Sequence, residues 1–198
     1  MATITFSVPH QHQEVQEAHP PPALGVIRSH AEYELTLRGV AASGLLPGVV
    51  GGTSVVGAFG SNGVRWTLAL TYLPESKRRG VAYGSTAVSS GLCADAVRSP
   101  SLTTSLCGEF ALGAIHTVVY DLVPLRPGDQ WTAAAAVGPQ VGWHRWAPLF
   151  VELGVSAWVG LLRPRFSVVS ADSTRSTTDF QSRLVSGTGF IGMGVATP

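Results

Sequence analysis

Residues 187–192 read Gly-Thr-Gly-Phe-Ile-Gly, which is the spacing of the glycine motif that binds the pyrophosphate of dinucleotides. In that motif a strand precedes the glycines, a helix follows them, and an acidic side chain stands about 20 positions further on. Only six residues follow Gly192, and none of them is acidic. The motif therefore does not predict a dinucleotide site, and residues 183–195 instead alternate as a strand rich in small residues.

Other residues that could do chemistry form no catalytic motif, since the chain has no P-loop, H-E-x-x-H, G-x-S-x-G or C-x-x-C sequence. Three histidines, His10, His12 and His19, could bind a metal ion, but the second pair of ligands that a closed site needs is missing. His116 and His144 are isolated near expected strand ends. The sequence therefore predicts no enzyme, no catalytic residues, no cofactor and no metal site.

The two cysteines, Cys93 and Cys107, each stand seven residues from Pro100. In a hairpin centred on Pro100 they would face each other, with Cα atoms about 4.5–5.5 Å apart, which is within disulfide range. This spacing predicts a disulfide and an oxidising compartment outside the cytoplasm. The alternative is two unlinked small side chains, because nothing near either cysteine indicates a catalytic thiol.

The elements that must position these residues are strands, because alternation with period two recurs along the chain and helical periodicity is almost absent. Each segment has about ten residues or slightly more, the length that a tilted strand needs to cross a bilayer. The pattern predicts an all-β protein, a closed antiparallel up-and-down barrel of about eight strands. The expected strands are residues 32–41, 49–59, 64–73, 81–93, 102–112, 130–142, 148–161 and 183–195.

Four charged residues, Arg38, Arg65, Glu109 and Glu152, lie mid-strand on the less apolar faces. In contact with lipid, each arginine would cost on the order of 2–4 kcal/mol at the bilayer midplane. Inside a barrel the four could pair with one another, so we expect a charge network in the lumen. A general acid/base pair would need two carboxylates about 5–10 Å apart in an open cleft, which the sequence does not establish.

The expected linkers differ in length. Residues 61–63 and 144–147 make short turns, whereas residues 115–129 and 164–182 make long loops, as in outer-membrane barrels. Trp143 and Trp146 flank one of the short turns, where an aromatic girdle would meet the membrane interface. The alternative is that both are ordinary strand aromatics.

Composition also favours a membrane. Charged residues make up 13% of the 198 residues, about half of the roughly 25% in soluble domains. The net charge of +1, without a basic stripe, excludes an electrostatic case for nucleic acid.

No transmembrane helix is predicted, because the chain contains no apolar run of about 18 residues. Residues 1–30 are expected to be a flexible lead-in without a recognisable signal peptide, and residues 31–198 a barrel domain.

Three segments carry a resemblance: LGVSAWVGLLRPRFSVV (153–169), the paired-cysteine hairpin CADAV and LCGEFALGAI around Cys93 and Cys107, and WTLALTYLPE (66–75). Over residues 31–196 the chain resembles uncharacterised β-barrel-like proteins common in myxobacteria. The resemblance implies an outer-membrane barrel with no assigned activity and no catalytic residues.

The sequence thus predicts a small outer-membrane barrel of a Gram-negative bacterium, structural or assisting passage or adhesion, with the lipid bilayer as its partner and no known small-molecule substrate. One alternative is a soluble lipocalin-like barrel that binds a small apolar ligand. Another is a β-sandwich interaction module of an assembly. The membrane barrel and the lipocalin-like barrel differ in where the apolar strand faces point, outward in the first and inward in the second. Alternation alone does not distinguish them, because exchanging inside and outside leaves the pattern unchanged.

Overall fold

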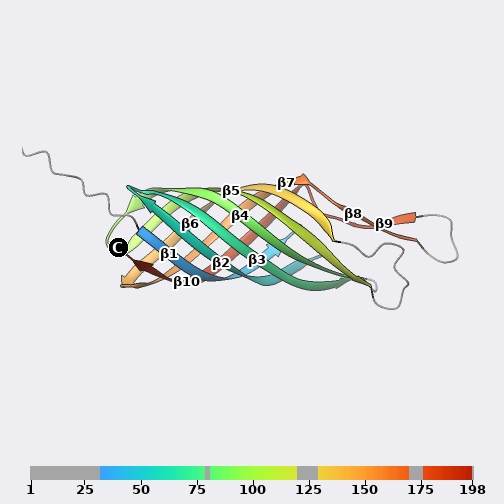
Figure 1. The fold of residues 1–198 in the computed structure, drawn as a ribbon, viewed down its shortest axis with the longest axis horizontal. Helices are drawn as coiled ribbons and strands as arrows, with labels where there is room; N and C mark the ends of the chain where they lie inside the picture. Colours follow the sequence, from blue (N-terminus) through green and yellow to red (C-terminus); the bar gives the residue numbers. More distant parts are fainter. Residues whose placement is uncertain (1–31, 79–80, 120–128, 170–175, 198) are drawn as a thin grey trace, which may run out of the picture.

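The computed structural model describes residues 32–78, 81–119, 129–169 and 176–197, and every element in them is a β-strand (Figure 1). None of the described residues forms a helix that could span a membrane. The expected lead-in and its histidines lie outside the described residues. The strands are β1 Glu32–Ser43, β2 Val49–Ser61, β3 Val64–Arg78, β4 Val81–Arg98, β5 Leu102–Val119, β6 Gln130–Trp146, β7 Leu149–Leu162, β8 Arg165–Val169, β9 Ser176–Gln181 and β10 Val185–Thr197.

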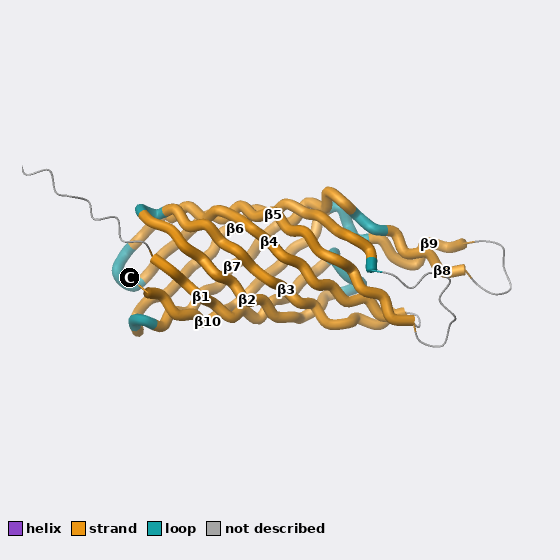
Figure 2. The backbone as a smooth tube through the Cα atoms, viewed as in Figure 1, coloured by secondary structure: helices purple, strands orange, loops and turns teal. Residues whose placement is uncertain are grey.

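Eight of these strands form one closed antiparallel barrel, in the order β1-β10-β7-β6-β5-β4-β3-β2 (Figure 2). Barrel strands that follow one another along the chain are neighbours in the wall, and β1 closes the barrel by pairing with β10. The up-and-down barrel expected from the sequence is confirmed, and a β-sandwich is excluded. Closure leaves no free edge in the barrel, so every barrel strand has a partner on both sides.

Paired residues followed around the barrel show how far the strands are staggered. When each residue is followed to its cross-strand partner, the row that starts at Tyr33 of β1 runs once around the barrel. It returns to β1 at Ser43, ten positions further on. Ten residues of about 3.3 Å against eight strand spacings of about 4.8 Å tilt the strands by about 40°. The row passes through Phe59, Trp66, Leu92, Gly108, Val137, Ala157 and Gly187.

The two ends of the barrel differ. Short turns at residues 62–63, 99–101 and 147–148 connect strands at the end where β1 begins and β10 ends; we call it the short-turn end. Asn62 and Gly63 both have positive φ, 55° and 81°, as a two-residue hairpin turn requires. The opposite end, called the loop end, has a short connection between β3 and β4, the longer connections after β1, β5 and β7, and the β8–β9 hairpin, which projects beyond the barrel (Figure 1).

The hairpin is the main difference from the sequence-based expectation of a loop over residues 164–182. Strands β8 and β9 pair antiparallel and form a separate two-stranded sheet. These strands have only five and six residues, and β9 is mostly polar, so they give too little alternation to be detected from the sequence. Strand β5 also continues to Val119, past its expected end at residue 112.

The glycine-rich segment of residues 187–192 lies in β10, so it is a strand. Gly187 and Gly189 lie on the outer face, whereas Gly192 and, two residues further on, Gly194 make room inside the barrel. A Cβ atom on Gly194 would lie 2.6 Å from Cζ of Phe150, and one on Gly192 would lie 2.9 Å from Cγ of Arg38. These two glycines face inward and are buried because large side chains of neighbouring strands occupy the space beside them.

Candidate functional site in the barrel lumen

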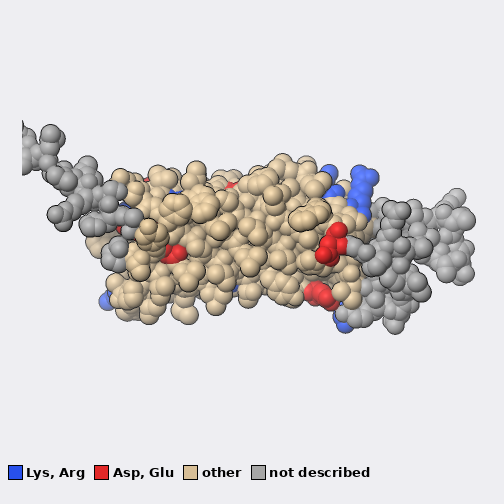
Figure 3. Space-filling view, viewed as in Figure 1, with Lys and Arg blue, Asp and Glu red and all other residues tan. Residues whose placement is uncertain are grey.

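The outer face of the barrel is apolar, and the inner face carries the polar groups. Leu37, Leu153 and Ile191 point outward with 63%, 55% and 64% of their surface exposed. The side of the barrel seen in Figure 3 is almost free of charge across its middle, and charged side chains gather towards the ends. This is the inverse of a soluble barrel, so the lipocalin-like alternative is wrong. An exterior of this kind fits the hydrocarbon core of a bilayer.

At the short-turn end, the lumen holds a cluster around Arg65. Its guanidinium donates hydrogen bonds to both Glu34 oxygens at 2.8 and 2.9 Å, and to Ser105 Oγ at 2.8 Å. It also donates to Asp95 Oδ1 at 3.2 Å, and Ser105 donates to the same oxygen at 2.7 Å. Arg98 at the rim pairs with Glu32 and reaches Asp95 at 3.8 Å. Each carboxylate of this cluster therefore faces a cation.

Further into the barrel, Arg38 forms a bidentate pair with Glu152, Nε to Oε1 at 2.5 Å and Nη2 to Oε2 at 3.1 Å. The guanidinium carbon also lies 4.1 Å from the ring centroid of Phe190, in cation–π geometry. Gly192 is the cross-strand partner of both Arg38 and Glu152. The pair meets where β10 has no side chain, so this glycine of the sequence motif serves the ion pair.

The four charged residues expected in the lumen do face inward, but they do not form one network. Arg65 pairs with Glu34 and Asp95, whereas Arg38 pairs with Glu152. Glu109 accepts one hydrogen bond, from Ser89 Oγ at 3.3 Å. Sequence reasoning missed Glu34, although it shares the polar face of β1 with Arg38, and Asp95, which lies beyond the expected strand end.

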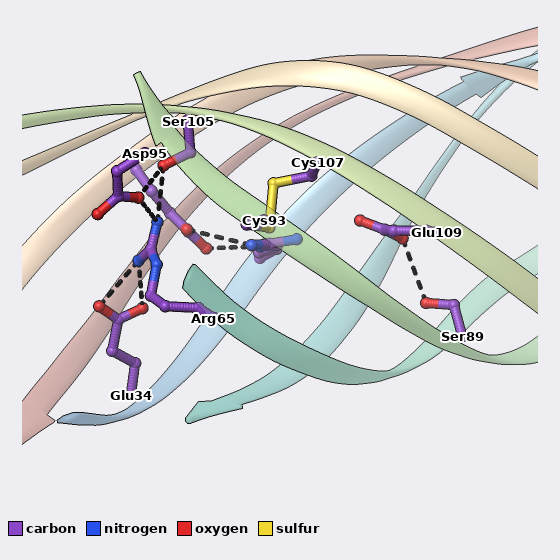
Figure 4. Close-up of a disulfide and its surroundings, with 10 residues drawn as sticks. Glu34, Arg65, Ser89, Cys93, Asp95, Ser105, Cys107 and Glu109 are labelled. Carbon is purple, nitrogen blue, oxygen red and sulfur yellow. Dashed lines mark hydrogen bonds and ion pairs between the residues drawn. A yellow bond between two sulfur atoms is a disulfide. The ribbon is translucent and has the colours of Figure 1, made fainter. Parts of the chain in front are cut away.

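A disulfide joins Cys93 and Cys107, as the sequence predicts, and these residues are direct partners across β4 and β5. Both side chains face the lumen and are buried. Along β5 the inward positions run Ser105, Cys107, Glu109, so the disulfide separates the Arg65 cluster from Glu109 (Figure 4). It therefore fastens the wall between the two levels of charge.

An apolar cap fills the lumen at the loop end. Tyr83 of β4 is fully buried, and its ring centroid lies 5.3 Å from that of Phe166 and 5.2 Å from that of Phe180. Phe166 belongs to β8 and Phe180 to β9, so the hairpin that sequence reasoning missed supplies the cap. The other buried members are Ala42, Leu46, Val50, Leu73, Val81 and Ile115.

Between the cap and the level of Arg38 lies a cavity of about 100 Å³. Its wall is made largely of small side chains from the inward positions of the barrel strands. Among the described residues, Arg38 and Glu109 are the only ionisable ones that line it. The small lining residues are Ala69, Ala87, Ala111, Gly113, Ala134, Ser54, Ser85, Ser89, Ser156 and Ser186.

The two tryptophans expected at a membrane interface lie on the outer face beside the β6–β7 turn. Trp143 is 45% exposed and Trp146 is 57% exposed, and their ring centroids are 5.4 Å apart. Phe59 and Trp66 form a second outward pair on β2 and β3, with centroids 5.0 Å apart.

His116 lies on the outer face near the loop end, between two oxygen atoms. Its Nδ1 is 2.8 Å from Asp129 Oδ1, and its Nε2 is 3.1 Å from Thr86 Oγ1. This resembles part of a hydrolase triad, but Thr86 sits mid-strand and is paired with Tyr72 on one side and Ala114 on the other. Its backbone is engaged in the barrel ladder, so it offers no oxyanion hole. The described segments also contain no group of three or more acidic, histidine or cysteine residues that could hold a metal ion.

No family model matches the chain, and a search of curated proteins finds no significant match. Solved structures do match. Neisserial surface protein A aligns with a TM-score of 0.55 at 12% identity, over 83% of this chain and 96% of that one. A major outer membrane protein from Thermus thermophilus aligns with a TM-score of 0.53 at 7% identity, over 84% of this chain and 99% of that one.

A third match is Ail, the attachment invasion locus protein of Yersinia pestis, solved in complex with the heparin analogue sucrose octasulfate. It aligns with a TM-score of 0.52 at 7% identity, over 84% of this chain and 97% of that one. At such identities the likeness concerns the fold. The chain therefore has the fold of small outer-membrane barrels, while the resemblance to myxobacterial proteins stays a prediction.

Proposed function

We propose that the chain is a small outer-membrane β-barrel of a Gram-negative bacterium, structural or assisting passage or adhesion, and not an enzyme. The observation that carries this proposal is the closed barrel with large apolar side chains outside and ion pairs inside. The shared fold with solved outer-membrane proteins supports it.

The same comparison supports an orientation. Outer-membrane barrels have short periplasmic turns and longer extracellular loops. The short-turn end would then face the periplasm, and the cap with the β8–β9 hairpin would lie outside the cell. Trp143 and Trp146, beside a short turn, would lie at the periplasmic interface.

Heat-modifiable migration tests the proposal. The chain, expressed with a signal sequence, should fractionate with outer membranes and need detergent for extraction. The folded barrel should migrate differently from the boiled protein on a denaturing gel, because a closed barrel resists the detergent until heated. A protein that is soluble and monomeric in buffer without detergent would contradict a membrane location.

One observation favours adhesion among the roles left open. Arg163, Arg165 and Arg183 are exposed at the stem of the hairpin, and no ion pair joins them to any residue that the structure describes. Arg165 pairs in register with Gln181, and a Cβ on Gly160 would meet both Arg163 and the backbone of Arg183. This places three arginines together at the loop end, where a sulfated polyanion would meet them.

The probe for this role is sucrose octasulfate, titrated into the detergent-solubilised protein at low and high salt. We expect binding that weakens with salt and with Arg163→Gln plus Arg165→Gln. Arg145→Gln, at the short-turn end, is the matched control and should bind as the parent protein does. Equal binding by all variants would rule out the hairpin stem as the site.

A further inference from the structure

We propose that the lumen cavity beneath the cap is a binding site for a small organic cation, a primary ammonium group on a short aliphatic chain. This goes beyond the membrane role proposed above. The site is bounded by Glu109 and Arg38 towards the middle of the barrel and by Leu45 and Leu73 towards the cap.

The charges around the cavity call for a cation. Arg38 is committed to Glu152 through two hydrogen bonds and to the ring of Phe190. Glu109 is left with one hydrogen bond, from Ser89, and no ion pair to another described residue. Figure 4 shows Glu109 and Ser89 on the far side of the disulfide from the Arg65 cluster. An inward carboxylate in a low-dielectric interior is costly unless a cation faces it.

A second polar group in the same wall lacks a partner. Ser85 is 1% exposed, and its Oγ makes no hydrogen bond in the described structure. Buried hydroxyl groups nearly always have a partner, so the Ser85 hydroxyl is a group to which a molecule in the cavity could hydrogen-bond. Ser85 stands four positions before Ser89 on β4, so the unpartnered group lies nearer the cap than Glu109 does.

The shape and lining of the cavity define the rest of the ligand. A volume of about 100 Å³ exceeds what one water needs and suits a small organic molecule. The walls between Glu109 and the cap are mostly alanine methyls and serine Cβ atoms, which favour an aliphatic chain. An ammonium group has three donors and no acceptor, which matches a carboxylate better than an alcohol does.

The experiment uses the full chain in detergent micelles, with the alanine methyl groups labelled for NMR. The probes are n-butylammonium and its uncharged analogue n-butanol. We expect n-butylammonium to shift the methyl signals of Ala87, Ala111 and Ala134 saturably, and not that of Ala41, which faces outward. Glu109→Gln should weaken binding about 10- to 100-fold, because it removes a charge-assisted hydrogen bond.

Two further variants separate binding from folding. Ala111→Leu keeps the carboxylate and fills the cavity, so it should abolish binding. Glu75→Gln removes a carboxylate at the loop end outside the cavity and should bind as the parent protein does. All variants are checked for heat-modifiable migration, which reports the barrel independently of the ligand.

The proposal is overturned if n-butylammonium shifts none of the lining methyls. It is equally overturned if n-butanol binds as tightly as n-butylammonium, or if Ala111→Leu or a folded Glu109→Gln binds like the parent protein. A soluble chain that still bound n-butylammonium would overturn the membrane role and leave the cation site standing.

Discussion

The two halves of the lumen are filled in different ways. In the short-turn half, Arg65 is surrounded by Glu34, Asp95 and Ser105, and the space is occupied by hydrogen-bonded charge. In the loop half, alanine and serine line a cavity that an aromatic cap covers. The comparison indicates that the first half holds the barrel wall together, while the second half leaves space that a ligand can use.

Glycine is what allows charge into so narrow a barrel. Each of the four inward charges expected from the sequence has a glycine as a cross-strand partner. Arg38 and Glu152 share Gly192, Arg65 faces Gly60, and Glu109 faces Gly91. A Cβ on Gly60 or Gly91 would lie within 3 Å of the facing charged side chain, at 2.9 and 2.7 Å from its Cγ. Charge and glycine therefore form one packing unit.

The largest effect should come from removing the cation of the short-turn half. Arg65→Met leaves the carboxylate of Glu34 buried without its cation and leaves Asp95 with only Arg98 at 3.8 Å, and breaking a buried pair costs about 3–5 kcal/mol. The free energy of unfolding in detergent micelles, measured with guanidinium chloride, should fall by that amount. Arg98→Met is the control, since its rim pair is half exposed and should contribute about 0–1 kcal/mol. Equal losses in both variants would remove the distinction between buried cluster and rim.

The next effect tests the junction between the halves. Replacing both Cys93 and Cys107 with serine releases a cross-link between residues 14 positions apart. In the chain-entropy model this costs about 3 kcal/mol of unfolding free energy. Reduction of the parent protein should lower its free energy of unfolding by the same amount, whereas the double variant should be insensitive to reductant. A parent protein whose stability does not change on reduction would show that the barrel ladder alone fastens this wall.

Much of the barrel follows from alternation along the chain. The expected segments all became strands, and Leu35 and Leu37 share the outer face of β1, as do Leu106 and Phe110 on β5. Alternation cannot show which face of each strand points into the barrel, because exchanging inside and outside leaves the pattern unchanged. Closure of the sheet settles it, since only then does one face surround a volume too small for the larger side chains.

The ion pairs could not be derived from the sequence. Arg38 and Glu152 are 114 positions apart and meet because β10 stands between their strands and contributes Gly192 there. That meeting needs the strand order, the register and the stagger at once. The cap needs more still, because Phe166 and Phe180 come from strands of only five and six residues, which are too short to carry a periodic signal.

A smaller effect should come from the glycine that serves the ion pair. Gly192→Ala places a Cβ 2.9 Å from Arg38 Cγ and 3.0 Å from Thr36 Cγ2. Such overpacking costs about 1–3 kcal/mol. Gly57→Ala is the matched control, because no atom lies within 4 Å of its new Cβ on the outer face. Chemical denaturation in micelles should separate the two variants, and equal stability would show that the Arg38–Glu152 pair can shift to make room.

The smallest effect should come from adding volume to the loop half. Ala69 lines the cavity and is 9% exposed, so Ala69→Val puts two methyl groups where the wall is not filled. Overpacking is destabilising only where neighbours already occupy the space, so the unfolding free energy should change by less than about 1 kcal/mol. The same denaturation measurement checks this against Gly192→Ala. A loss as large as that of Gly192→Ala would mean that the two halves are packed equally tightly. A small change would instead show that the cavity tolerates added atoms, as a site that admits an aliphatic chain must.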